Sequence, residues 1–185
     1  MSRIIAGELG GRRLGVPPGR ATRPTSDRTR EALFSSLSAT HDLDAGVFLD
    51  LYAGSGAVGL EAISRGAPGA VLVEASKVAA QVIEQNIRDL RVGDRARVIA
   101  SRVETALATL RGLGAATVFL DPPYGEDSDG ISETIRTLVD EKIAGDDALI
   151  ILERDRRSDW RWPDVVEPVR DRRYGETVLW YGRPL

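Results

Sequence analysis

The 185-residue chain contains no cysteine and a single histidine, His41. Disulfide bonds and thiolate metal sites are therefore excluded, and neither a histidine-based metal centre nor a histidine-containing catalytic triad is expected. His41 is predicted to be a polar loop residue between a helix and a strand. Long apolar runs are also absent, and the first residues lack the apolar region of an export signal, so we expect a cytoplasmic protein without membrane association.

Lysine is scarce, because Lys77 and Lys142 are the only two, and arginine supplies nearly all of the positive charge. The net charge of −3 argues against indiscriminate binding of nucleic acid over the whole surface. The charge is distributed unevenly along the chain. Residues 1–30 contain seven arginines and two acids, so their net charge is +5, which leaves −8 for the remaining residues. Guanidinium groups suit bidentate phosphate contacts and stacking on bases. This segment therefore indicates either a phosphate-binding surface or an ordinary solvated one.

The alternation of apolar strands with helical patterns predicts the fold class. At 42% hydrophobic and 29% charged residues, the chain has the composition of one globular domain. From residue 47 onward it reads as βα units, which predicts an α/β fold with a mostly parallel seven-stranded sheet, closed by an antiparallel hairpin around Tyr174-Gly175. The predicted strands are 47–51, 70–74, 97–100, 117–120, 148–152, 165–173 and 177–181, and the predicted helices are 57–65, 76–90, 103–110 and one from about 129.

An amino-terminal extension, residues 1–42, is predicted to precede the main domain, residues 43–185. Strands at 3–6 and 12–16 are joined through Gly10-Gly11, which can take the positive φ that a hairpin turn needs. After a loop, a helix is expected from the N-cap Ser26 to about residue 39.

The tetrapeptide Asp121-Pro122-Pro123-Tyr124 follows the apolar run 115–120 directly. It places a carboxylate, free carbonyl groups and an aromatic ring at the carboxyl end of a buried strand, where open α/β sheets bind ligands. These groups suit chemistry on a flat ring that bears an amine. The alternative is a simple strand-ending turn, because Asp and Pro are common turn residues.

A glycine-rich segment, Asp50-Leu51-Tyr52-Ala53-Gly54-Ser55-Gly56-Ala57-Val58-Gly59, connects the first strand of the main domain to a helix. Gly54 and Gly56 allow a tight turn at a helix amino terminus, and Glu74 follows 20 residues after Gly54, where a carboxylate can hold ribose hydroxyls. The spacing suits either a dinucleotide or S-adenosylmethionine. A phosphate-binding P-loop is excluded because no Lys-Ser/Thr follows the glycines.

Asp50 favours S-adenosylmethionine, because a carboxylate below the cofactor could bind the ammonium group that a nicotinamide dinucleotide lacks. Each acid also has a simpler interpretation. Asp50 could cap a helix or brace the loop, and Glu74 could be an ordinary surface acid.

Taken together, the motifs resemble the class I S-adenosylmethionine-dependent methyltransferases, and more narrowly the RsmD family. The resemblance covers essentially the whole chain in order. It implies a monomeric Rossmann-like enzyme that methylates the N2 amine of a guanine in 16S ribosomal RNA, within the assembled or partly assembled small ribosomal subunit, with no metal. The matching segments are 3–7, 11–14, 23–31, 50–56, 121–124 and 174–177.

The resemblance also implies roles for individual residues. Asp121, Pro122, Pro123 and Tyr124 would hold the target base. The cofactor-binding residues would be Asp50, Tyr52, Gly54, Ser55, Gly56, Glu74, Arg102 and Val103. The residues that hold the RNA backbone would be Arg12, Arg13, Arg23, Arg28 and Arg30, or these arginines would have surface and helix-dipole roles.

Two other functions fit parts of the pattern. A DNA adenine-N6 methyltransferase uses the same tetrapeptide and cofactor, but the chain has no additional segment for a sequence-reading domain. A nicotinamide-dependent oxidoreductase shares the glycine template, but it leaves the tetrapeptide without a role.

Overall fold

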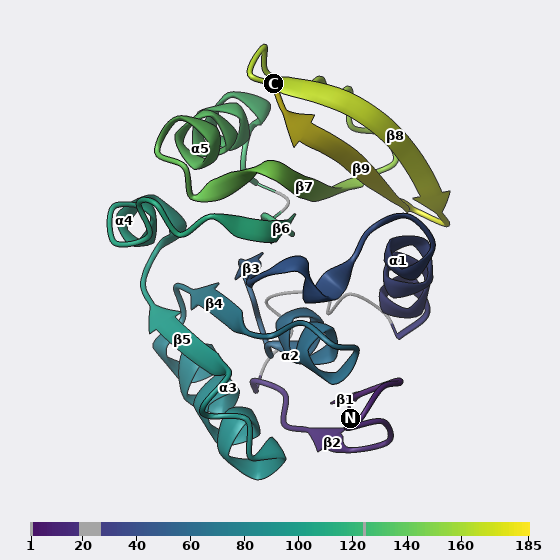
Figure 1. Cartoon of the computed structure of the whole chain (residues 1–185), viewed down its shortest axis with the longest axis vertical. Coiled ribbons are helices and arrows are strands. Elements are labelled where there is room, and N and C mark those ends of the chain that lie inside the picture. Colours follow the sequence, from purple (N-terminus) through teal and green to yellow (C-terminus); the bar gives the residue numbers. More distant parts are fainter. Residues whose placement is uncertain (1, 19–26, 124) are drawn as a thin grey trace.

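A seven-stranded sheet forms the centre of the computed structural model, which describes residues 2–18, 27–123 and 125–185 (Figure 1). The strand order is β5-β4-β3-β6-β7-β9-β8, with β3 to β7 parallel and the β8–β9 hairpin antiparallel at one edge. The strands are β3 (Phe48–Leu51), β4 (Ala70–Glu74), β5 (Ala96–Ala100), β6 (Ala115–Leu120), β7 (Ala144–Asp155), β8 (Val166–Tyr174) and β9 (Thr177–Pro184).

Helices cover both faces of the sheet, with α1 and α2 on one side and α4 and α5 on the other in Figure 1. Alternate residues of the strands pack into two cores, as Leu49 and Leu51 do on one face and Phe48 on the other. The predicted α/β class and the mixed seven-stranded sheet are thus confirmed. The helices are α1 (Asp27–Thr40), η1 (Leu43–Ala45), α2 (Ala57–Ser64), α3 (Lys77–Leu90), α4 (Val103–Leu107) and α5 (Ser128–Asp140).

Boundaries differ from the sequence prediction at a few elements. Helix α4 ends three residues early because the chain breaks into turns before Gly112 and Gly114, both with positive φ. Strand β7 is much longer than predicted, since its ends pair with β6 and β9 beyond the apolar run. Ser26, the predicted N-cap of α1, lies outside the described residues.

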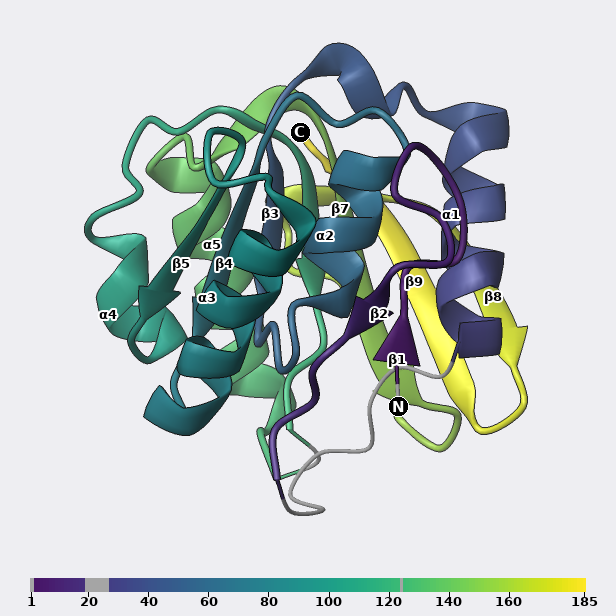
Figure 2. The ribbon, with the colours of Figure 1, turned by 90° about the horizontal axis from the view of Figure 1, so that it is seen from below.

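The amino-terminal hairpin consists of β1 (Ser2–Arg3) and β2 (Arg13–Leu14) and lies beside α2 (Figure 2). Gly7 has a φ of +84°, and a Cβ there would lie 1.8 Å from the Ser64 carbonyl oxygen, so only glycine permits this approach. The Glu8 amide donates to that same oxygen at 2.8 Å. The extension is therefore fitted closely to the helix that follows the glycine-rich segment.

The buried carboxylate of Glu61, on α2, also binds this extension. It accepts hydrogen bonds from the amides of Ile5 (2.7 Å) and Ala6 (3.0 Å), and Arg65 pairs with it at 2.7 Å. Because a buried charge is stable only when it is paired and hydrogen-bonded, these contacts tie the hairpin to α2.

Candidate active site

The candidate site lies at the carboxyl ends of β3, β4 and β6. Strand β3 pairs in parallel with β4 on one side and with β6 on the other, so the chain order reverses there. Leu51 is in register with Val73 and with Leu120, which brings the segments after the three strands to one edge. Such a switch point is where open α/β sheets bind ligands. Two segments meet here, named the glycine loop (residues 50–59) and the proline loop (residues 121–127).

The backbone of the glycine loop requires two of its glycines. Gly54 and Gly56 have φ of +58° and +77°, and Gly56 is the N-cap of α2. A Cβ on Gly56 would lie 3.0 Å from Leu72 Cδ2 and 3.2 Å from Ile83 Cγ2, whereas a Cβ on Gly54 would meet nothing within 4 Å. Gly56 is therefore needed for packing, and Gly54 leaves open space for a ligand to approach the backbone.

Two predicted carboxylates hold this loop in shape. Glu74 accepts from the Gly54 amide at 2.8 Å and from the Ser76 amide at 2.7 Å. Asp50, which is 1% exposed, accepts from the Gly59 amide at 2.9 Å. Both acids thus brace the loop, which is the simpler interpretation given above for Asp50, and Glu74 is a half-buried acid that also holds the loop.

Burial raises the pKa of Asp50 to about 7, and the nearby charges of Asp121 and Glu74 add to this rise. The hydrogen bond from Gly59 acts in the opposite direction; it is smaller than the effect of burial but larger than that of either charge. The carboxylates of Asp121 and Glu74, at two neighbouring strand ends, therefore act on Asp50 at this edge of the sheet. A cation beside Asp50 would relieve this repulsion.

The remaining predicted cofactor residues lie on the same edge. Ser55 is buried in the loop. Arg102 is exposed as the N-cap of α4, where it pairs with Glu104 at 3.3 Å, and Val103 is buried. The Ser101 amide donates to the Glu74 carbonyl at 3.0 Å, so this segment lies next to Glu74.

The proline loop begins directly after β6. Asp121 is half-buried, Pro122 is buried and Pro123 is exposed, while Tyr124 lies outside the described residues. The Glu126 amide donates to the Pro123 carbonyl at 2.9 Å, which closes a turn. Asp121 precedes this turn, and the pairing of β6 with β3 brings it close enough to Asp50 for its charge to raise the pKa of Asp50.

The structure adds two residues that the sequence prediction missed. Glu126 accepts a hydrogen bond from the Tyr52 hydroxyl at 2.8 Å, and so joins the two loops. Asn86, 2% exposed, bonds both the amide (2.7 Å) and the carbonyl (3.1 Å) of Gly15 and donates to the Ser55 carbonyl at 3.0 Å. Neither has a motif around it, because each acts across a long sequence separation.

A family model described as Conserved hypothetical protein 95 matches residues 2–183. The Ribosomal RNA small subunit methyltransferase D of Escherichia coli (strain K12) is 43% identical over 151 residues, which cover 82% of this chain and 73% of that protein. A protein of the same name from Buchnera aphidicola subsp. Acyrthosiphon pisum is 31% identical over 154 residues, covering 83% and 78%. The chain belongs to the RsmD family.

The solved structure of yhhF from Escherichia coli shares 35% identity with the chain at a TM-score of 0.81, covering 98% of this chain and 97% of that one. The RsmD resemblance and the Rossmann-like methyltransferase fold predicted from sequence are both confirmed. The similarity extends over the amino-terminal hairpin as well as the main domain.

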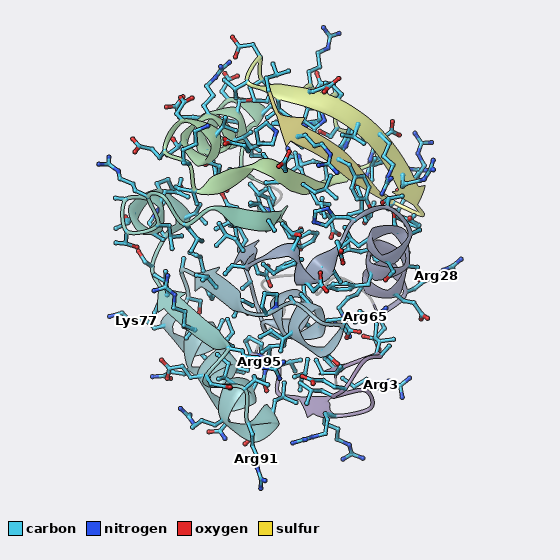
Figure 3. The ribbon with its side chains drawn as sticks, in the orientation of Figure 1. Arg3, Arg28, Arg65, Lys77, Arg91 and Arg95 are labelled. Atoms are coloured by element: carbon cyan, nitrogen blue, oxygen red, sulfur yellow. The ribbon has the colours of Figure 1, made fainter. Side chains whose placement is uncertain are left out.

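The arginines predicted to contact RNA differ in their exposure. Arg12, Arg13 and Arg28 are exposed, and Figure 3 shows Arg28 projecting outward from α1. One Arg12 nitrogen donates to the Asp89 carbonyl at 2.5 Å. Arg23 lies outside the described residues.

Arg30 requires a correction, because the prediction that it contacts the RNA backbone is wrong. Its side chain is 1% exposed, donates to the Arg3 carbonyl at 2.5 Å and pairs with Asp27 at 3.1 Å. Burial lowers its pKa, an effect opposed by the charges of Glu61 and Asp27. Arg30 therefore joins α1 to the hairpin within the fold.

The described residues contain neither a candidate metal site nor a candidate membrane-spanning helix. No group of three or more His, Cys, Asp or Glu side chains among them could hold a metal ion. No helix in the described ranges is both long and apolar enough to cross a membrane. His41 lies in the loop after α1, as predicted, with Nε2 2.8 Å from Thr117 Oγ1.

Proposed function

We propose that the protein transfers a methyl group from S-adenosylmethionine to the exocyclic N2 amine of a guanine in 16S ribosomal RNA, in the small ribosomal subunit or its precursor. The observation that carries this proposal is the meeting of the glycine loop and Asp121-Pro122-Pro123 at the sheet's switch point. The family membership and the name of the Escherichia coli relative support ribosomal RNA as the substrate.

The groups around the glycine loop fit S-adenosylmethionine. Open space beside Gly54 leaves room for the ligand, and the carboxylates of Asp50 and Glu74 would face it. Asp50 would bind the ammonium group, while Glu74 would hold the ribose hydroxyls. The remaining contacts to the ligand would come from Tyr52, Gly54, Ser55, Gly56, Arg102 and Val103.

Bound S-adenosylmethionine supplies an electrophilic methyl group on a sulfonium. The chain must then bring a weakly nucleophilic amine into line behind that methyl, and such positioning can supply much of the acceleration. Asp121 and the Pro122 carbonyl would accept N–H hydrogen bonds from the amine and turn its lone pair toward the methyl. A nitrogen–carbon bond would form, the sulfur–carbon bond would break with its electron pair left on sulfur, and the amine would release one proton to Asp121 or to water.

The target base must be unpaired or flipped out to reach this site, at a cost of a few kcal/mol that is least in an RNA loop. Tyr124 would stack on the base, and Pro123 would shape the turn beside it. The amino-terminal extension, residues 1–42, would contact the RNA through Arg12, Arg13, Arg23 and Arg28, and residues 43–185 would form the catalytic domain. We expect a cytoplasmic monomer.

One experiment tests this function. The protein and labelled S-adenosylmethionine are incubated separately with 16S ribosomal RNA, small subunits and DNA, and the modified base is mapped by mass spectrometry. The proposal expects label on guanine N2 in ribosomal RNA or subunits. Label found only on DNA adenine would overturn it.

A further inference from the structure

Glu126 lies three residues after Pro123 and is held from three directions. Its carboxylate accepts the Tyr52 hydroxyl at 2.8 Å, and its amide donates to the Pro123 carbonyl at 2.9 Å. Its own carbonyl accepts from both terminal nitrogens of Arg154, on β7, at 3.3 Å. The proline loop is thereby connected to the glycine loop and to the sheet through one residue.

The partner of Glu126 is unusual in its backbone. Tyr52 has a φ of +64°, a conformation that favours glycine, and such residues cluster at functional sites when the surrounding structure maintains them. Burial raises the pKa of the Tyr52 hydroxyl, as does its hydrogen bond to Glu126, so the hydroxyl keeps its proton and donates.

A purely structural explanation would be that Glu126 caps α5. The cap of α5 is already present, however, because the Asp127 side chain accepts from the Gly130 amide at 2.7 Å. The Glu126 carboxylate instead points back across 74 residues of sequence to the glycine loop. Its contact therefore relates the two halves of the site to each other.

We propose that Glu126 is a positioning residue for the acceptor base, which acts with Tyr52 to keep the proline loop in register with the glycine loop. This inference rests on the proposed methyl transfer. If the contact is lost, Asp121 and the Pro122 carbonyl are no longer held at the distance that in-line attack requires. Because misplacement of about 1 Å can reduce a rate by about 10²-fold, the acceptor step is expected to slow while cofactor binding is retained.

Three variants separate this role from a general effect on folding. Tyr52→Phe keeps the ring and removes only the hydroxyl, and Glu126→Ala removes the acceptor. Glu126→Gln keeps an oxygen that can accept the same hydrogen bond, so it should restore most of the function. Glu133→Gln, an exposed change on α5, is the matched control.

The kinetic measurement varies ribosomal RNA at saturating S-adenosylmethionine, and calorimetry gives the affinity for S-adenosylhomocysteine. Tyr52→Phe and Glu126→Ala should each lower kcat/KM for RNA by about tenfold to a hundredfold, and Glu126→Ala should leave the cofactor affinity unchanged. The double variant Tyr52→Phe/Glu126→Ala should be no worse than the more affected single variant, because both remove one interaction. Wild-type values for all variants, or fully additive losses, would overturn the inference.

Amide hydrogen exchange of the ligand-free protein gives a readout that does not depend on activity. Residues of the proline loop should exchange faster in Tyr52→Phe and Glu126→Ala than in wild type, Glu126→Gln or Glu133→Gln. Equal exchange in all five proteins would contradict the role of Glu126. If the wild-type protein methylates no RNA, the proposed function is wrong. The comparison of exchange rates would still test whether Glu126 holds the proline loop in place.

Discussion

The glycine loop and the proline loop lie side by side but are fixed in different ways. The glycine loop is held at its backbone: Glu74 and Asp50 accept its amides, and the helix that follows it, α2, is buried at every position. The proline loop is half-exposed and is fixed by a turn and by the contacts of Glu126. Damage to the glycine loop should therefore reduce cofactor binding and stability, whereas damage to the proline loop should reduce transfer in a stable protein.

Among the changes that should leave the cofactor bound, Asp121→Ala in the proline loop is expected to have the largest effect. We expect kcat for methyl transfer to fall by about 10²-fold or more, because the amine is no longer oriented toward the methyl. Affinity for S-adenosylmethionine and the melting temperature should stay close to wild type. The control is Asp129→Ala, an exposed acid in the first turn of α5. A fully active Asp121→Ala protein would contradict the mechanism.

Valine at the two glycines should separate backbone strain from packing. Both changes place a side chain at a positive φ and should abolish cofactor binding in calorimetry. Gly56→Val should also meet Leu72 and Ile83, and so cost more than the roughly 1–3 kcal/mol expected of backbone strain alone at Gly54. Chemical denaturation measures the difference. Equal stability of the two variants would show that the space around Gly56 is not limiting.

Asn86→Ala tests whether the amino-terminal extension supports the glycine loop. The change removes three hydrogen bonds and leaves the Gly15 amide and the Ser55 carbonyl without this partner. We expect a loss of about 1–3 kcal/mol in the free energy of unfolding and faster exchange of the Gly15 amide. Gln85→Ala, on the exposed side of the same helix, should change neither. If Asn86→Ala and Gln85→Ala had the same free energy of unfolding and the same exchange rate at Gly15, the extension would not support the glycine loop.

Asp50 should make cofactor affinity depend on pH. Its pKa is raised from 3.8 to about 7, so its contribution to stability is full below about pH 4 and is lost as the pH rises through 7. Ammonium binding requires the ionised form, so affinity for S-adenosylhomocysteine should weaken by about tenfold per unit below pH 7. Calorimetry from pH 5.5 to 8.5 should show this slope in wild type and a flat profile in Asp50→Asn. If Asp50→Asn kept the pH dependence of wild type, a group other than Asp50 would be responsible for it.

Arg28→Ala should have the smallest effect. Because Arg28 is exposed on α1, its loss should leave stability unchanged and reduce the salt dependence of RNA affinity by about one unit of slope. Filter binding over a series of salt concentrations measures this slope, with Arg91→Ala, at the far end of α3, as control. If Arg28→Ala and Arg91→Ala gave identical slopes, Arg28 would not be one of the residues that contact RNA.

Local patterns predicted most of the fold and the glycine loop. Strand 70–74 was located to the residue, and the turn at Gly54 and Gly56 followed from backbone preferences that act within a few residues. Arg30 was misjudged because a count of charges cannot tell which guanidinium becomes buried against Glu61. Glu126 and Asn86 were missed since their partners are 74, 71 and 31 residues away. Only the packed chain brings such groups together.

A crystal structure with S-adenosylhomocysteine tests most directly whether the two loops form one active site. The ligand should lie along the glycine loop, with its ribose at Glu74, its ammonium at Asp50 and its sulfur facing Asp121 and Pro122. A ligand bound elsewhere, or with its sulfur turned away from the proline loop, would contradict the account.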